Sequence, residues 1–181
     1  RQIIDKHRAW PKNVSSIKKF FDSNPKIIAT NRRVSEVLSS YIILIQKNNK
    51  KDNFVDNFLN QNNIPINTDN RVKALWENYV SDPYQSLVIG LQNFRENIHL
   101  VDYNDLMINS ETELNKIYEF LEIKPHTHDF SNILNTCAEE KDGAWGLENL
   151  HLIRPKLQKT SLQPEEVIGE ENVKLYDKFN I

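Results

Sequence analysis

Two arginines stand where an apolar segment of the sequence gives way to a helical pattern. Residues 26–30 (Lys-Ile-Ile-Ala-Thr) predict a buried parallel strand, and residues 34–46 predict a helix with one apolar face. Arg32 and Arg33 lie at the junction. Ligands of open parallel sheets bind at the carboxyl ends of the strands, and an arginine fork bonds two phosphate oxygens at once. The N–H groups of a helix start favour anions too. The junction therefore indicates a phosphate site, with ordinary surface charges as the alternative.

A serine further along the same pattern is a second candidate ligand. Ser40 lies eight residues after Arg32. If the helix began at once, the two residues would be about 12 Å apart along its axis. They could share one ligand if the chain makes a turn between Arg32 and the start of the helix. Ser35 would then be the N-cap of that helix.

The rest of the chain must supply the scaffold that positions these residues. Short apolar strands alternate with amphipathic helices, which predicts an α/β fold with a parallel sheet flanked by helices. We expect further strands over 2–5 and 97–102 and further helices over 11–21 and 111–121. Ser110 and Glu113 have the spacing of a capping box at the start of the second helix. A long helix should run from 68 or 69 to 94, with an interruption at Asp82-Pro83. Residues 1–181 are expected to form a single domain, in which the polar segment 47–70 is an insertion or a lid.

The composition excludes several classes of protein. The 181 residues include 23 Lys and Arg against 25 Asp and Glu, a formal net charge of −2, so a nucleic-acid partner is not expected. No apolar run approaches the roughly 18 residues of a membrane span. Cys137 is the single cysteine, which fits a reducing compartment and a cytoplasmic location. The spacing of His126 and His128 resembles that of metal ligands. No third and fourth ligand follow at a metal-site spacing, so no metal is expected.

Residues 26–41 resemble the 3′-phosphate-binding motif of the sulfotransferase family. In that motif an apolar strand is followed by an arginine and, eight residues later, by a serine and a tyrosine. Members of the family use the sulfate donor 3′-phosphoadenosine 5′-phosphosulfate (PAPS) and release adenosine 3′,5′-bisphosphate (PAP). The resemblance implies a sulfotransferase fold similar to that of P-loop NTPases. It also implies that Arg32 and Ser40 bind the 3′-phosphate of the donor.

Residues 100–121 resemble a second family segment, a strand that ends in Tyr-Glu-Asp-Leu and the helix that follows it. This chain has Asn104 where the family pattern has glutamate. The resemblance implies that Tyr103 lies against the adenosine of the donor. The alternative is a core tyrosine that ends a strand.

Residues 151–169 resemble a basic family loop that folds over the 3′-phosphate. The candidates that it offers are Arg154, Lys156 and Lys159. The alternative is a solvated basic loop without a ligand.

The opening of the chain resembles the catalytic segment of the family. In the cytosolic branch, a central strand ends in Lys-Thr-His, and that histidine is the general base that takes the proton of the acceptor. His7 falls at the matching position, and Lys6 beside it could steady the charge on the bridging oxygen. The pattern Asp-Lys-X-Arg-X-Trp over 5–10 is more similar to a bacterial and viral branch, which has no histidine at the third place. An exposed histidine near a chain end is the alternative.

The phosphosulfate loop of the family has no counterpart in this sequence. Such a loop needs closely spaced glycines and a lysine, whereas the four glycines here are Gly90, Gly143, Gly146 and Gly169. In the family this loop precedes the Lys-His strand. We therefore expect that the chain is incomplete at its N-terminus, covers the C-terminal two-thirds of a family domain and is inactive alone.

By this resemblance, the protein transfers a sulfuryl group from PAPS to a hydroxyl or amine of a small-molecule or carbohydrate acceptor. Two alternatives remain. A small-molecule kinase of the same layer fold would need a lysine-containing phosphate loop and a metal-binding aspartate. A non-catalytic nucleotide-binding or interaction module would bind PAP without transferring sulfate.

Overall fold

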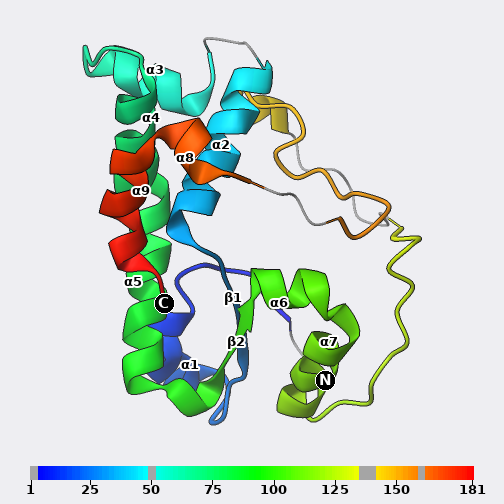
Figure 1. Cartoon of the computed structure of the whole chain (residues 1–181). Coiled ribbons are helices and arrows are strands. Elements are labelled where there is room, and N and C mark those ends of the chain that lie inside the picture. Colours follow the sequence, from blue (N-terminus) through cyan, green and yellow to red (C-terminus); the bar gives the residue numbers. More distant parts are fainter. Residues whose placement is uncertain (1–3, 49–51, 135–141, 159–161) are drawn as a thin grey trace. The chain divides into compact units, whose positions relative to one another are not determined.

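The computed structural model describes residues 4–48, 52–134, 142–158 and 162–181. It is rich in helices, and its described part contains one parallel pair of strands (Figure 1). In chain order the elements are η1 (Pro11–Asn13), α1 (Val14–Phe20), β1 (Ile27–Asn31), α2 (Val34–Asn48), α3 (Phe54–Gln61), α4 (Thr68–Leu75), the π-helical η2 (Trp76–Val80), α5 (Ser81–Asn93), η3 (Arg95–Asn97), β2 (Ile98–Asp102), α6 (Tyr103–Ile108), α7 (Ser110–Leu121), η4 (Asp142–Trp145), α8 (Pro164–Ile168), α9 (Glu170–Tyr176) and η5 (Asp177–Phe179).

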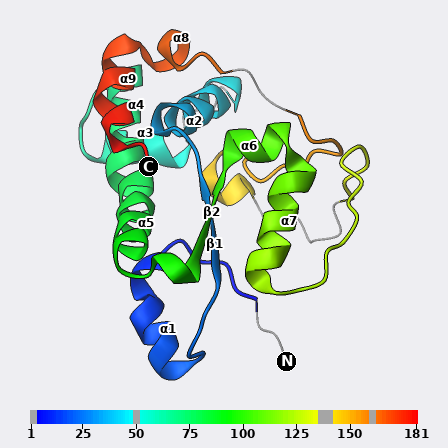
Figure 2. The same cartoon turned by 60° about the horizontal axis from the view of Figure 1, so that its bottom comes forward.

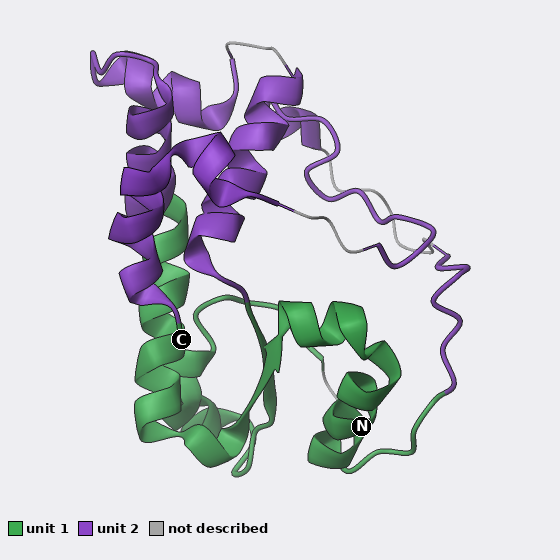
Figure 3. Ribbon diagram, in the orientation of Figure 1, with its two compact units in different colours: residues 1–31, 78–126, 181 green, residues 32–77, 127–180 purple. Residues whose placement is uncertain are grey.

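The chain forms two compact units, which Figure 3 shows in different colours. Unit 1 contains residues 1–31, 78–126 and 181, and unit 2 contains residues 32–77 and 127–180. The expectation of a single domain over 1–181 stays a prediction.

Unit 1 is built around the parallel strands β1 and β2. Their β-branched residues favour extended backbone, and the register runs from Ile27↔Ile98 to Asn31↔Asp102. The predicted strands over 26–30 and 97–102 are thus confirmed, but β1 alternates between half-buried and exposed residues instead of being fully buried. Helix α5 packs closely on η1. The approach at Gly90 leaves no room for a side chain, since a Cβ atom there would lie 2.7 Å from both Pro11 Cβ and Ile98 Cδ1.

Helices α6 and α7 of unit 1 follow β2 directly. The Asp102 carboxylate caps α6 by accepting hydrogen bonds from the N–H groups of Asn104 and Asp105. The predicted helix over 111–121 is confirmed, but its capping box is wrong. Ser110 is already helical and its hydroxyl donates to the carbonyl of Leu106 at 2.8 Å, because α6 ends just before α7.

The predicted interruption of the long helix is confirmed as a restart at α5. Pro83 lies in the first turn of α5, where its missing N–H costs the helix little. The five residues before α5 have π-helical geometry, which the sequence pattern did not predict.

Unit 2 is a helical unit with α2 at its centre. Figure 2 shows α3, α4, α8 and α9 gathered near α2, and α2 packs against α4, α8 and α9. The apolar stripe of α2 (Leu38, Ile42 and Ile45) is buried, as its helical spacing predicts.

The polar segment 47–70 contributes to the core of unit 2. Val55 and Leu59 on α3 are buried, as is the carboxylate of Asp56, which receives two hydrogen bonds from Arg71. A role of this segment as a lid stays a prediction.

The N-terminal strand expected over 2–5 is wrong for its described part. Ile4 and Asp5 have no strand structure, and residues 2 and 3 lie outside the described residues. The segment is instead fixed by local side-chain bonds, such as the one from the Trp10 indole to the Asp5 carboxylate at 2.9 Å.

Candidate active site

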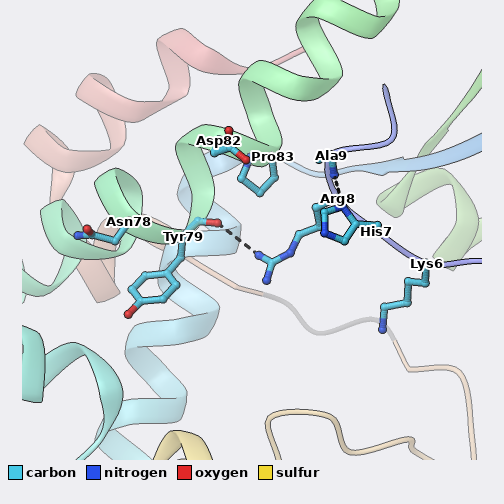
Figure 4. A pocket seen from close by; sticks show the side chains of 8 residues that line it. All are labelled: Lys6, His7, Arg8, Ala9, Asn78, Tyr79, Asp82 and Pro83. Carbon is cyan, nitrogen blue, oxygen red and sulfur yellow. Dashed lines mark hydrogen bonds between the residues drawn. The ribbon is translucent and has the colours of Figure 1, made fainter. Parts of the chain in front are cut away.

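A cavity of about 380 Å³ opens in unit 1, between the N-terminal segment and the start of α5. Two segments of the chain line it (Figure 4). The N-terminal segment contributes Lys6, His7, Arg8 and Ala9, and the end of η2 with the start of α5 contributes Asn78, Tyr79, Asp82 and Pro83. Its volume is in the range of small-molecule sites. The two candidate catalytic residues, Lys6 and His7, are neighbours in the sequence and both line this cavity.

Arg8 is anchored to the backbone of the π-helical segment. Its Nη1 donates a hydrogen bond to the carbonyl oxygen of Tyr79 at 3.3 Å (Figure 4). In a regular helix, this carbonyl would accept from the N–H four residues later. That residue is Pro83, which has no N–H. Pro83 therefore cannot donate to this carbonyl, and Arg8 does.

His7 lines the cavity and is exposed, and its Nδ1 faces the backbone. Its Nδ1 accepts a hydrogen bond from the N–H of Ala9 at 3.1 Å. The neutral imidazole therefore has its lone pair on Nδ1 and its proton on Nε2. The ring also contacts Trp10, with 5.6 Å between the ring centroids.

The charges of the cavity are predominantly positive. Lys6 has no hydrogen-bond or ion-pair partner within the described ranges, and the only bond of Arg8 there is the one to Tyr79. The one carboxylate in the lining, Asp82, forms an ion pair with Lys12. Such a cavity attracts anions.

The start of α2 in unit 2 holds the two arginines of the predicted phosphate site. Arg32 forms an ion pair with Glu36 one turn later at 2.8 Å, and the exposed fractions of these side chains are only 17% and 18%. Arg33 pairs with Asp177 and, at 3.5 Å, with Glu165. Partial burial alone would lower the pKa of Arg33, but the hydrogen bonds and charges of these two carboxylates raise it.

The N–H groups at the start of α2 are already bonded, contrary to the expectation that they are available to a phosphate. The N–H of Val34 donates to the Asn180 side chain at 2.8 Å, and that of Ser35 donates to the Asp177 carboxylate at 3.1 Å. Ser35 is therefore not the N-cap of α2. Caps from distant residues cannot be identified from a local sequence pattern.

Ser40 is the seventh residue of α2, which begins at Val34, and its side chain is exposed. Its neighbour Ser39 is fully buried, and the Ser39 hydroxyl has no hydrogen-bond partner among the described residues. Of these two serines, only Ser40 presents its hydroxyl to a ligand from solvent.

Tyr103 in unit 1 is the first residue of α6 and directly follows the last registered residue of β2, Asp102. It is half-buried. The alternative of a core tyrosine that ends the strand is wrong, since β2 ends at Asp102 and Tyr103 is helical and half-buried; its contact with an adenosine stays a prediction.

The basic segment of unit 2 presents two of its three candidates to solvent. Arg154 and Lys156 are exposed and have no partner among the described residues, while Lys159 lies outside them. The backbone near these side chains is held, because the carbonyl of Pro155 accepts from the N–H of Ile133 at 2.8 Å and the N–H of Leu157 donates to Phe130.

Metal ligands and membrane helices are not seen in the part of the chain that the structure describes. No group of three or more His, Cys, Asp or Glu residues there is arranged to hold a metal ion, and Cys137 lies outside that part. No described helix is both long and apolar enough to cross a membrane.

The sequence interpretation missed the roles of Arg8, Tyr79 and Pro83 in the cavity. A signal for them was present, since a proline in a helical pattern leaves the carbonyl four residues earlier without its usual donor. Arg8 as the residue that binds this carbonyl could not be found in the same way, because the two are far apart in the sequence.

Comparisons with known proteins place the chain in a family. The family model described as "Sulfotransferase domain" matches residues 5–164. No curated protein and no solved structure gave a significant match. The matched range includes the cavity and the arginines at the start of α2.

Proposed function

The chain belongs to the sulfotransferase family, and we propose that it transfers a sulfuryl group from PAPS to a hydroxyl or amine of a small-molecule or carbohydrate acceptor. The products are the sulfated acceptor and PAP. The proposed fold is similar to that of P-loop NTPases, the branch is the bacterial and viral one, and the proposed location is the cytoplasm. The protein acts mainly by positioning the reactants and neutralising their charge.

The observation that carries this proposal is the arrangement at the start of α2, in the chain order that the family motif requires. Arg32 follows β1 directly and Ser40 is exposed on α2. We propose that both bind the 3′-phosphate of the donor, with help from the exposed basic residues Arg154 and Lys156 and from Lys159. Tyr103 is the proposed contact of the adenosine. These assignments rest on the family motif and, for Ser40, Arg154 and Lys156, also on exposure.

His7 is the proposed general base, and Lys6 the proposed partner of the bridging oxygen. When the acceptor oxygen bonds to the sulfur, the bond from sulfur to the phosphate oxygen of the donor breaks and the acceptor proton passes to His7. The lone pair that takes this proton lies on Nδ1, so protonation replaces the hydrogen bond from the Ala9 N–H. Lys6 balances the negative charge on the departing PAP.

Substituting the two arginines one at a time tests the donor assignment. We expect Arg32→Ala to weaken PAP binding by about tenfold or more, because a charge-assisted bond to a phosphate is lost. Arg33→Ala should weaken it much less, because the family motif assigns the phosphate to Arg32 alone; pairing does not distinguish the two, since Arg32 binds Glu36 and Arg33 binds Asp177 and Glu165. Calorimetric titration of both variants with PAP measures this difference. Equal, small effects would contradict the assignment.

A further inference from the structure

The cavity of unit 1 has the volume of a small-molecule site, and two cationic side chains, Lys6 and Arg8, line it. It measures about 380 Å³, and its walls include the aromatic ring of Tyr79 and the apolar surface of Pro83 and Ala9. Burial raises the pKa of Tyr79, so its phenol stays neutral at physiological pH. A cavity of this kind accommodates a ring-sized molecule as well as a charged group.

Arg8 is the residue whose orientation the structure explains. Its Nη1 is held by the Tyr79 carbonyl, which Pro83 cannot bind. Its Nε and Nη2 groups have no acceptor within the described ranges. A guanidinium that donates one hydrogen bond to the backbone and has two further N–H groups without acceptors can bind two oxygens of a carboxylate, sulfate or phosphate group.

The remaining charges favour an anionic ligand over a neutral one. Lys6 has no partner within the residues that the structure describes, and the negative charge of Asp82 is balanced by Lys12. An acidic group in the cavity would gain the attraction of two cations without displacing an existing ion pair.

We infer that Arg8 binds an acidic group of the acceptor, so that the acceptor class is a small molecule or sugar that carries a carboxylate or an ester of sulfate or phosphate. This inference rests on the proposed function. Arg8 fixes the acidic group, the Tyr79 and Pro83 surfaces contact the body of the acceptor, and its nucleophilic oxygen or nitrogen faces His7. Arg8 is a specificity-determining residue, and Pro83 positions it.

The test compares a carboxylated sugar with its neutral counterpart. Titration of the protein with glucuronate and with glucose, each at saturating PAP, should give measurable binding of glucuronate only. Arg8→Gln should weaken glucuronate binding by about tenfold, since it removes a charge-assisted bidentate contact. The matched control is Lys124→Gln, which removes a positive charge from an exposed residue of unit 1 outside the cavity. It should leave glucuronate binding unchanged.

A second variant tests how Arg8 is oriented. In Pro83→Ala, the new N–H can donate to the Tyr79 carbonyl and compete with Arg8. We expect glucuronate binding to weaken by a smaller factor than in Arg8→Gln, with no loss of thermal stability. Binding equal to that of the unchanged protein would overturn the positioning role of Pro83.

Three outcomes would overturn the acceptor assignment. These are equal affinities for glucuronate and glucose, equal effects of Arg8→Gln and Lys124→Gln, and a loss of PAP affinity in Arg8→Gln that matches the loss for glucuronate. The last outcome would assign Arg8 to the donor instead. Failure of the unchanged protein to bind PAP would contradict the proposed function instead, and glucuronate titrations without PAP would still test the cavity.

Discussion

The hydrogen bond between Ala9 and His7 sets the chemistry that this histidine can perform. With the Ala9 N–H facing Nδ1, the neutral ring holds its proton on Nε2. A base that acts through Nδ1 must give up this bond when it takes the proton. The structural role of His7 and its proposed role as a base therefore involve the same atom, and a suitable substitution can separate the two.

His7→Asn is that substitution. The asparagine side-chain oxygen can accept the Ala9 N–H much as Nδ1 does, but it cannot take a proton at neutral pH. In a longer chain that includes the phosphosulfate loop, we expect the melting temperature to stay unchanged and the rate of PAP release from PAPS, in the presence of an acceptor, to fall by about 100-fold or more. An unchanged rate in His7→Asn would exclude His7 as the base. His7→Ala should lose the same rate and also the local hydrogen bond.

At the scale of elements, the start of α2 depends on residues from the end of the chain. Asp177 accepts the Ser35 N–H and also pairs with Arg33, while Asn180 accepts the Val34 N–H. These contacts satisfy N–H groups that a helix start otherwise leaves without partners. They also fix the backbone from which Arg32 projects.

Replacing Asp177 tests this capping. Asp177→Ala removes both the cap and one of the two carboxylate partners of the partly exposed Arg33, so we expect the free energy of unfolding to fall by about 1–2 kcal/mol. Asp177→Asn keeps an oxygen for the Ser35 N–H and should lose less than half of that. Chemical denaturation of the two variants measures the difference. Equal losses in both variants would show that the charge, and not the cap, is what matters.

The elements that could be predicted from the sequence are those with strong local patterns. Both strands of the parallel pair and the helix α2 were found from apolar runs and helical spacing. The capping box at Ser110 failed because the preceding helix α6 offers this hydroxyl a carbonyl, that of Leu106. The caps of α2 and the bond from Arg8 to Tyr79 join residues far apart in the chain, and no local pattern encodes them.

At the scale of the whole molecule, the family match runs through residues of both units. Lys6, His7 and Tyr103 belong to unit 1, whereas Arg32, Ser40, Arg154 and Lys156 belong to unit 2. The residues proposed for the 3′-phosphate thus all come from unit 2. Because this phosphate belongs to the donor, its recognition can be measured with nucleotides alone, without knowing the acceptor.

The most direct test of the account is a calorimetric comparison of PAP with adenosine 5′-monophosphate, which lacks the 3′-phosphate. Several charge-assisted hydrogen bonds to that phosphate should make PAP bind about 100-fold more tightly than the monophosphate. Higher salt should reduce this preference, because exposed charges contribute to it. Equal affinities for the two nucleotides would contradict the central claim that this sulfotransferase-family protein recognises PAPS through its 3′-phosphate.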